Sequence, residues 1–599
     1  MALTTPSAPS EPQPFELNGG IDNKEQYLPS SPSEDFEPES NQVPDQASTD
    51  PTANQEDQWV TGIKLINIMA ALTLACVLVL LDVSIVSTAI PRITSDFHSL
   101  PDIGWYGGAY QLASATLQLL TGKLFMNFSS KWTFLIFFAL FELGSLICAV
   151  STSSKMLIVG RAVAGMGSSG LLNGTFTIIA GCAPMAKIPA LIGFVMAGEF
   201  TDNLVSDCML TVSLVSNLGL VMGPLIGGAF TEYTTWRWCF YINLPFGGLI
   251  VAMLAFIHIP DQIPKPKPMS VVRTIHSKLD LIGFALFAPA AIEILLALQY
   301  GGIHFAWNSP QVIGLFCGAG STFVVFLVWE YHKGDAAMIP FSMVRKRIVW
   351  ASCLNYGFFM AQLYCASYYL PVYFQGVKGA SPLLSGVYLL PSILGQLFST
   401  ITSGVLGWLN THSDGPVTDT PAVGKLGFYL PFAIISAVIL AVSGGILSTL
   451  SPETSTARWI GYQIFLGVGR GLGLQIPIIA VQNTLPQEQT SLAMALLMFS
   501  QSFTGALFLS FGETIFTNSL KTLIPKYAPS IDPQTVINEG AAGFRTHMSP
   551  ADLTNVLVAY SKSVDRVFYL SAGAGVACFI FSWGMGWKDI RKKREVSKA

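Results

Sequence analysis

Six charged residues stand inside long apolar stretches of the sequence: Asp82, Glu142, Arg161, Glu293, Arg470 and Glu513. A charge is costly in hydrocarbon, so each of them indicates a functional position. Asp82 lies late in the apolar stretch 65–88, and Arg161 lies early in the stretch 157–181. If these stretches cross a membrane in opposite directions, the two side chains lie at similar depth and can pair. A carboxylate beside an arginine can take up or release a proton when its surroundings change.

We therefore predict that Asp82 and Arg161 form a proton-coupling pair. The alternative is a permanent ion pair that only orients two helices. Glu142 and Glu293 are expected either to face polar cavities or to lie in protein contacts. Glu513, at the end of its apolar stretch, is predicted to lie at the membrane interface.

The composition places these residues in a membrane protein. The chain has 599 residues, of which 51% are hydrophobic and 11% charged, whereas a soluble domain carries about 25% charged residues. Many apolar stretches reach the roughly 20 residues that a helix needs to cross a bilayer. The sequence therefore predicts an all-α, polytopic membrane protein.

Enzymatic and metal-binding signatures are missing from the sequence. It contains no CxxC pair, no HExxH and no GxxxxGK[ST] loop, and most of its nine cysteines lie in apolar stretches. These observations argue against a zinc site, a disulfide framework and direct ATP hydrolysis. We expect no enzyme activity and no cofactor, and a carrier of this type would draw on an ion gradient or on the gradient of its substrate.

Fourteen membrane spans are predicted, and Lys and Arg in the short loops orient them. The loops after even-numbered spans are rich in these residues, so even loops and both termini are predicted to be cytoplasmic. Residues 513–566 then form a long outer loop. The spans are 65–88, 104–122, 133–151, 157–181, a fifth ending near 231, 240–259, 281–300, 311–329, 349–370, 384–408, 426–446, 459–481, 491–514 and 567–586.

Glycine-rich stretches mark three of the spans. "GRAVAGMGSSG" and "GVGRGLGLQIP" each place short-spaced glycines beside an arginine, which favours close helix packing and two related halves. The fifth span contains Gly219, Gly223 and Gly227 on one helical face, with Pro224 and Gly228 beside them. Pro224 removes a backbone donor and bends the helix. This face could seal or slide against a neighbouring span.

At these residues the sequence resembles the major facilitator superfamily, specifically its fourteen-span drug:proton antiporter branch, and most closely the fungal toxin and multidrug efflux pumps. "GLVMGPLIGG" resembles the antiporter motif, and "GRAVAGMGSSG" resembles the motif whose arginine, here Arg161, is implicated in proton coupling. "LDVSIVSTAIP" resembles the span-1 motif that carries Asp82. "WRWCFYINLPFGG" and "YYLPVYFQGVKGASPLLSG" are also typical of the branch, and the resemblance covers about residues 60–590.

The resemblance implies two six-helix bundles plus two extra central helices, fourteen transmembrane helices in all. The predicted parts are a disordered acidic cytoplasmic tail with 12 acidic residues (1–58), an N-terminal bundle (60–259), a linker with the two extra helices (260–347), a C-terminal bundle (348–587, with the outer loop 515–566) and a basic cytoplasmic tail (588–599).

The cytoplasmic gate loop after the second span departs from the family pattern. Met126 stands where an aspartate is expected, while Gly122, Lys123 and Lys131 remain. The lysines are expected to contact an acidic group or a helix end. The charge latch of the family is therefore in question.

Six polar residues on central helices are candidates for lining a substrate cavity: Tyr110, Gln111, Asn173, Gln362, Tyr369 and Gln475. Together with aromatic side chains they would suit a bulky amphipathic molecule. The alternative for each is an ordinary hydrogen bond between helices.

The resulting prediction is a proton-coupled exporter of small hydrophobic or amphipathic molecules, such as a toxin, secondary metabolite or drug, that works by alternating access. Alternatives are a siderophore or basic amino acid carrier on the same scaffold, or a non-transporting membrane sensor. The expected partners are a small-molecule substrate and the lipid bilayer, with no nucleic acid, and the chain is expected to be a monomer. The plasma membrane is the predicted location, with the vacuolar membrane as the alternative.

Residues 198–214 interrupt the fifth span with Glu199, Asp202 and Asp207. Without them, 189–197 joins 215–230 as one 25-residue span with the antiporter motif. We hypothesise a retained intron of 51 bases, because the encoded residues permit a donor-like GTGAGT and a T-rich acceptor end. The competing reading is a genuine insertion in a cytoplasmic loop, and sequencing the cDNA decides between them.

Overall fold

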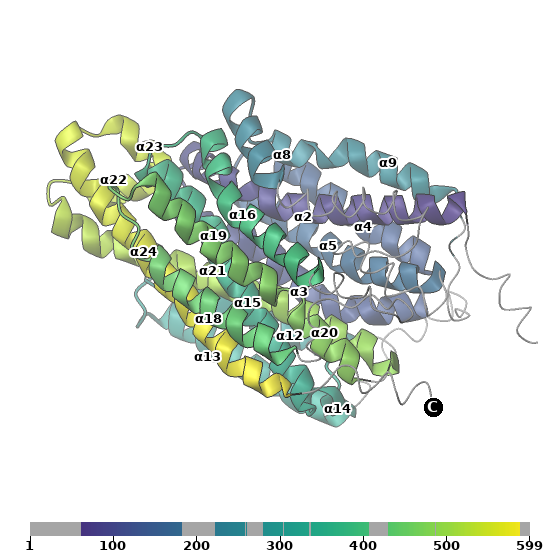
Figure 1. The fold of residues 1–599 in the computed structure, drawn as a ribbon. Coiled ribbons are helices and arrows are strands. Elements are labelled where there is room, and N and C mark those ends of the chain that lie inside the picture. Colours follow the sequence, from purple (N-terminus) through teal and green to yellow (C-terminus); the bar gives the residue numbers. More distant parts are fainter. Residues whose placement is uncertain are drawn as a thin grey trace, which may run out of the picture. The chain divides into compact units, whose positions relative to one another are not determined.

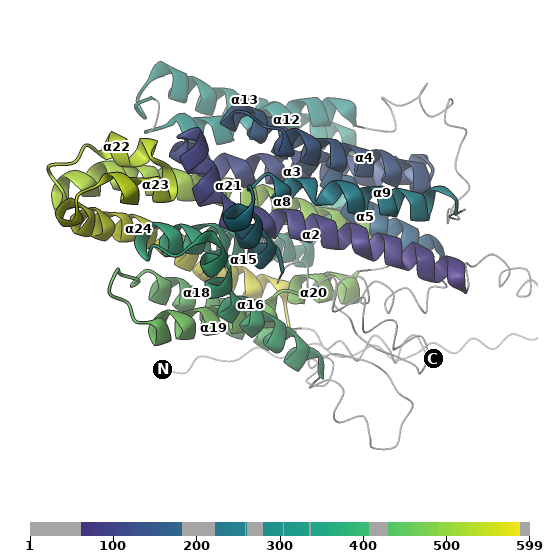
Figure 2. The same ribbon diagram turned by 90° about the horizontal axis from the view of Figure 1, so that it is seen from above.

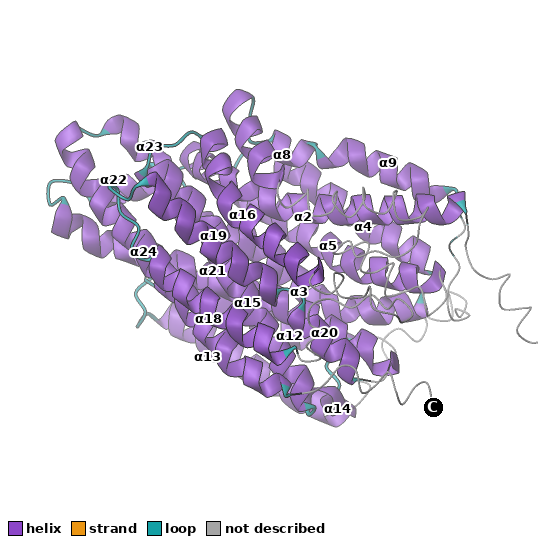
Figure 3. Cartoon of the chain, in the orientation of Figure 1, coloured by secondary structure: helices purple, strands orange, loops and turns teal. Residues whose placement is uncertain are grey.

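The computed structural model describes residues 62–182, 222–257, 259, 280–302, 305–334, 337–405, 429–485 and 487–587. This part of the chain is helical, as Figure 3 shows, and its β-pairing is limited to an isolated bridge between Gly301 and Phe305. The all-α prediction is confirmed for these residues. Both predicted tails, the 198–214 interruption and Gly219 lie outside them.

The first half of the chain forms a series of helices, most of them long (Figure 1). They are α2 (Ile63–Phe97), α3 (Ile103–Asn127), α4 (Ser130–Ala149), α5 (Ser154–Cys182), a helical segment 222–233, α8 (Trp238–Tyr241) and α9 (Asn243–Ala255), with the short turn η1 (Leu100–Asp102) between α2 and α3. Two further helices follow, α12 (Leu281–Tyr300) and α13 (Pro310–Lys333). These two pack on each other, and α12 also contacts α21 and α3 (Figure 2).

The second half continues in the same manner. Its elements are α14 (Phe341–Val344), α15 (Arg347–Val372) running into the π-turn η3 (Tyr373–Val377), α16 (Pro382–Val405), α18 (Leu430–Leu447), α19 (Thr456–Gly473), α20 (Ile476–Thr484), α21 (Gln487–Tyr527), α22 (Pro533–Asn538), α23 (Gly540–His547), α24 (Pro550–Ser582) and η4 (Trp583–Met585).

The helices have the length and apolarity of membrane spans. Among the described residues, ten helices are long and apolar enough to cross a membrane. Three more helices, α3, α5 and α15, contain 25, 29 and 26 residues and exceed the roughly 20 that a span requires. The predicted count of fourteen is compatible with this arrangement without being established by it.

Two predicted segments have local structure that the sequence does not show. Thr456–Val481 has the length and apolarity of one span, as predicted for 459–481, but its helix is interrupted: α19 ends at Gly473 and α20 begins at Ile476, next to Pro477. The predicted outer loop 515–566 is almost entirely helical: α21 continues to Tyr527, α22 and α23 follow, and α24 begins at Pro550. The helices α22 and α23 form because their apolar side chains have a place to be buried, and Val536, Ile537, Ala541 and Phe544 are at most 1% exposed.

Glycines allow the close helix packing that the sequence predicts. A Cβ at Gly165 would lie 2.2 Å from the carbonyl oxygen of Tyr110, and one at Gly167 would lie 2.3 Å from the backbone nitrogen of Phe141. These glycines therefore bring α5 against α3 and α4. In the second half, a Cβ at Gly467 would lie 2.2 Å from the carbonyl oxygen of Ser392, so α19 approaches α16 in the same way.

Candidate functional site

A buried ion pair joins α2 and α5 in the first half of the chain. The Nη1 atom of Arg161, on α5, lies 2.6 Å from Oδ2 of Asp82, on α2. The two side chains are 1% and 0% exposed. Taking both charges out of water costs free energy, and only close geometry with further hydrogen bonds can offset that cost.

The neighbouring helices supply those further contacts. Arg161 donates from Nε to the carbonyl oxygen of Tyr106 at 2.9 Å, and its guanidinium lies 4.4 Å from the ring centre of Tyr110. Asn243 donates to Oδ1 of Asp82 at 3.5 Å and to Oγ of Ser145 at 3.0 Å. Helices α2, α3, α4, α5 and α9 therefore meet around the pair. The sequence pattern did not single out Asn243, although an asparagine in the apolar run "FYINLPF" is a signal of this kind.

A second carboxylate lies beside this group. Glu142, on α4, has two buried side-chain oxygens without a hydrogen-bond partner among the described residues. A Cβ at Gly247 would lie 2.4 Å from its Oε1, so the carboxylate is held against α9. The sequence predicts that Glu142 either faces a polar cavity or lies in a protein contact, and the structure shows the contact with α9. Glu293 also lies in a contact, since Thr322 of α13 donates to its Oε2 at 3.5 Å.

The described part of the glycine motif packs against α2. A Cβ at Gly227 would lie 2.4 Å from the carbonyl oxygen of Ile85, and one at Gly223 would lie 1.9 Å from Oγ of Ser84. Thr88 donates to the carbonyl oxygen of Pro224 at 3.2 Å. These contacts form the close-packing face that the sequence predicts for the segment 222–233.

The same segment also touches the second half of the chain. A Cβ at Gly228 would lie 2.5 Å from the carbonyl oxygen of Pro382, and one at Gly386 would lie 2.4 Å from that of Pro224. Glu232 accepts a hydrogen bond from the backbone N–H of Leu383 at 3.1 Å, at the start of α16. We call this contact between segment 222–233 and the start of α16 the glycine seam. It joins the first half of the chain to the second at the side predicted to be outer.

Residues 72–509 match the sequence profile of the Major Facilitator Superfamily. The chain belongs to this superfamily. It is 58% identical to the MFS-type transporter pigP of Monascus ruber over 92% of this chain and 91% of that one, and 47% identical to the efflux pump mlcE of Penicillium citrinum over 94% and 98%. The chain is thus a multi-pass membrane transporter and not an enzyme.

Solved structures agree on the fold. A bacterial homolog of the human lysosomal transporter Spinster, in an inward-facing and unoccupied conformation, matches with a TM-score of 0.55 and 14% identity over 88% of this chain and 98% of that one. A D-xylose-proton symporter matches with a TM-score of 0.52 and 12% identity over 87% and 97%. At such low identity these matches support the transporter fold alone.

Both lysines of the loop that is predicted to be the cytoplasmic gate donate hydrogen bonds to backbone carbonyl oxygens. Lys123 donates to the carbonyl oxygen of Ala337 at 3.1 Å. Lys131 donates to the carbonyl oxygens of Ala255 and Ile257 at 2.7 and 2.9 Å, at the end of α9. A cation is favourable at a helix C-terminus. Lys131 therefore contacts a helix end, which is one of the two partners predicted for it. Gly122 has open space around it, and the side chain of Met126 is outside the described ones.

The six cavity candidates are distributed over α3, α5, α15 (Gln362 and Tyr369) and the junction of α19 with α20. Gln111 donates to the hydroxyl of Tyr364 at 2.5 Å and so links α3 to α15. Asn173 donates to the carbonyl oxygen of Gln118 at 3.0 Å, while Tyr110 lies under Arg161. Tyr369 is fully buried and packs on the ring of Phe516, and Gln475 lies at the break between α19 and α20. Their role in binding substrate stays a prediction.

Glu513, on α21, is 0% exposed and packs against the start of α3. Its position at the membrane interface stays a prediction. Thr517 donates to its Oε1 at 2.6 Å, and a Cβ at Gly104 would lie 2.9 Å from Cβ of Glu513. The helix α21 continues for 14 residues beyond Glu513.

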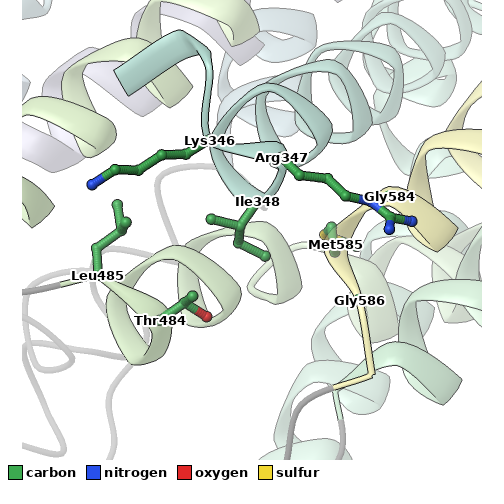
Figure 4. Close-up of a pocket in the computed structure, with 8 residues that line it drawn as sticks. All are labelled: Lys346, Arg347, Ile348, Thr484, Leu485, Gly584, Met585 and Gly586. Carbon is green, nitrogen blue, oxygen red and sulfur yellow. The ribbon is translucent and has the colours of Figure 1, made fainter. Parts of the chain in front are cut away.

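A pocket of about 470 Å³ lies among the described residues at the end of the transporter that is predicted to be cytoplasmic (Figure 4). None of the six candidates lines it. Arg347 points toward η4 and donates to the carbonyl oxygen of Trp583 at 3.0 Å. The pocket is lined by Lys346, Arg347, Ile348, Thr484, Leu485, Gly584, Met585 and Gly586.

Proposed function

We propose that this transporter exports small hydrophobic or amphipathic molecules across the plasma membrane in exchange for protons, as a monomer with both termini in the cytoplasm. The observation that carries the proposal is the buried ion pair between Asp82 and Arg161. The relatives named as efflux pumps support the direction of transport. No cofactor is required, because the proton gradient supplies the energy.

The proton step follows from the geometry of the pair. A proton that enters from outside and binds to Asp82 removes the negative charge, and the attraction that holds α2 to α5 is lost. Arg161 keeps its bond to the carbonyl oxygen of Tyr106, and Asn243 remains beside the neutral carboxyl group. Release of the proton to the cytoplasmic side restores the pair. Movement of α2 against α5 would thus accompany each proton.

The glycine seam gives this movement a path to the second half of the transporter. Segment 222–233 touches α2 through Gly223 and Gly227, and touches α16 through Gly228. A shift of α2 would therefore move segment 222–233 and change its contact with α16, where the two halves meet. Close contacts of this kind favour two discrete arrangements over continuous deformation.

The test is export of the dye rhodamine 6G from reconstituted vesicles with and without an imposed pH gradient. We expect wild-type export to depend on the gradient, and Asp82→Asn and Arg161→Ala to remove that dependence. The matched control is Asp96→Asn, since Asp96 forms a partly exposed ion pair with Arg92 at 3.2 Å, and the amide oxygen of asparagine can still accept the hydrogen bond that Trp236 donates to Asp96. A surface pair contributes about 0–1 kcal/mol, so this variant should behave like the wild type. Undiminished, gradient-dependent export by both buried-pair variants would refute the proton-coupling role, and uptake without export would refute the direction.

A further inference from the structure

A second buried arginine lies in the other half of the transporter. Arg470, on α19, is 5% exposed. It donates from Nε to Oε1 of Gln362 at 3.4 Å and from Nη2 to the carbonyl oxygen of Leu363 at 3.0 Å, both on α15. No carboxylate of the described residues lies within 4 Å of Arg470. The ion pairs found among all the described residues are Arg161–Asp82 and Arg92–Asp96, both in the first half.

The setting of Arg470 resembles that of Arg161 in two respects and differs in the charge of its partner. Each arginine stands in a glycine-rich helix, and each contacts the first long helix of its own half. Arg161 meets the carboxylate of Asp82 there, whereas Arg470 meets the neutral amide of Gln362. In its described residues, the second half therefore keeps the buried cation and lacks an anion that balances it.

The groups around Arg470 are suited to receive an anion. Guanidinium has five N–H donors in a planar fork that matches a carboxylate, and the amide and carbonyl contacts leave its charge uncompensated. The Nε2 of Gln362 is buried without a hydrogen-bond partner in the described structure, and Gln362 is 0% exposed. It is a second donor beside the guanidinium. On the adjoining face of α16, Ser392, Gln396 and Ser399 lie at i, i+4 and i+7 against the glycines that flank Arg470.

We propose that Arg470 and the amide of Gln362 bind the carboxylate of an amphipathic organic acid that the transporter carries. The inference rests on the proposed export function, and it adds the chemical class of the substrate. In this structure the position is enclosed, so the acid would enter when α15 and α19 move relative to the first half. The carboxylate of the acid would then pair with Arg470 as the carboxylate of Asp82 pairs with Arg161.

The test uses purified full-length transporter in lipid nanodiscs and two probes of similar shape, 1-pyrenebutyrate and 1-pyrenebutanol. Binding is followed by energy transfer from the protein's 12 tryptophans to pyrene. We expect the wild type to bind the acid more tightly than the alcohol. Arg470→Gln should raise the Kd of the acid by about tenfold or more, equivalent to about 1.4 kcal/mol, and should leave the Kd of the alcohol within about twofold. Arg458→Gln, an exposed position on the same helix, is the matched control and should change neither.

A second variant keeps the proposal testable if Arg470→Gln fails to fold. Gln362→Glu supplies an internal carboxylate to Arg470, as Asp82 does for Arg161, so it should weaken acid binding while raising the melting temperature. Equal binding of acid and alcohol by the wild type, or equal losses for both probes in the variants, would overturn the proposal. Displacement of pyrenebutyrate by an equal concentration of chloride would assign the site to an inorganic anion instead. Binding needs no pH gradient, so Asp82→Asn should retain the preference for the acid even where proton coupling fails.

Discussion

Replacing Gly386 with alanine should force the two halves of the transporter apart at the glycine seam. The added Cβ would lie 2.4 Å from the carbonyl oxygen of Pro224, about 1 Å short of the 3.4 Å at which ordinary contact begins. That oxygen belongs to the backbone, so it cannot rotate away as a side chain can. Overpacking of this kind costs about 1–3 kcal/mol, which changes a two-state equilibrium by about 5- to 150-fold.

The assay reports the opening of the outer side in intact cells. Thr94, near the end of α2, is 0% exposed, and its Oγ1 accepts a hydrogen bond from the backbone N–H of Ala541 at 3.2 Å. A cysteine at this position (Thr94→Cys) is therefore shielded while α23 lies on α2. We expect a membrane-impermeant maleimide to label it slowly, and to label it faster by about the same 5- to 150-fold when Gly386→Ala is also present. Chains that lack the new cysteine give the background.

Gly461→Ala is the matched control for this experiment. It makes the same change in a helix of the same half, but a Cβ at Gly461 meets nothing within 4 Å. Labelling of Thr94→Cys should therefore stay at its original rate with Gly461→Ala. An unchanged rate with Gly386→Ala in a folded protein, or an equal increase with both alanine variants, would refute the reasoning that the seam holds the two halves together at the side predicted to be outer.

Three further predictions concern contacts outside the seam. Arg545→Met removes hydrogen bonds from Nη1 to two carbonyl oxygens of η3, at 2.9 and 3.0 Å, and should speed protease cleavage of α22–α23 at the surface of intact cells. Arg161→Gln should lower the free energy of unfolding by about 3–5 kcal/mol because Asp82 stays buried without its partner, and the double variant with Asp82→Asn should recover part of that loss in thermal unfolding. Burial raises the pKa of Asp280, but hydrogen bonds from an indole and from backbone N–H groups outweigh it and leave the pKa below its usual value. The stability from Asp280 is therefore present above its usual pKa of about 3.9 and is lost as the pH falls through the lower folded value, so Asp280→Asn should lower the melting temperature at neutral pH and flatten its acid dependence.

The membrane helices could be predicted because their length and apolarity are local properties of the sequence. The predicted span 281–300 coincides with α12 (Leu281–Tyr300), and the predicted span 349–370 lies within α15. The break between α19 and α20 could not be predicted from Pro477 alone. Prolines also occur inside helices that stay continuous, as Pro91 does in α2 and Pro391 does in α16. Whether a proline breaks a helix depends on the neighbours that satisfy the freed backbone groups.

The candidate site shows the same division between local and tertiary information. Helix direction and depth were enough to place Asp82 near Arg161. The position of Asn243 depends on how α9 packs against α2 and α4, and that packing leaves no periodic signal in the sequence. The partner of Gly228 is likewise visible only in three dimensions, because α16 begins more than 150 residues later.

The two buried arginines cannot exchange roles under the proposed mechanism. A substrate anion at Arg161 would have to displace Asp82 from a 2.6 Å contact, whereas a proton needs no such room. Arg470 faces Gln362, which cannot ionise, so this arginine gains no charge partner from the protein when the pH changes. Proton uptake and acid binding are then separate events in separate halves, joined through the contacts between them. It follows that Gln362→Glu should abolish the preference for an acid while export of a neutral molecule stays dependent on the pH gradient. Loss of both properties in this one variant would instead indicate a single site shared by proton and substrate.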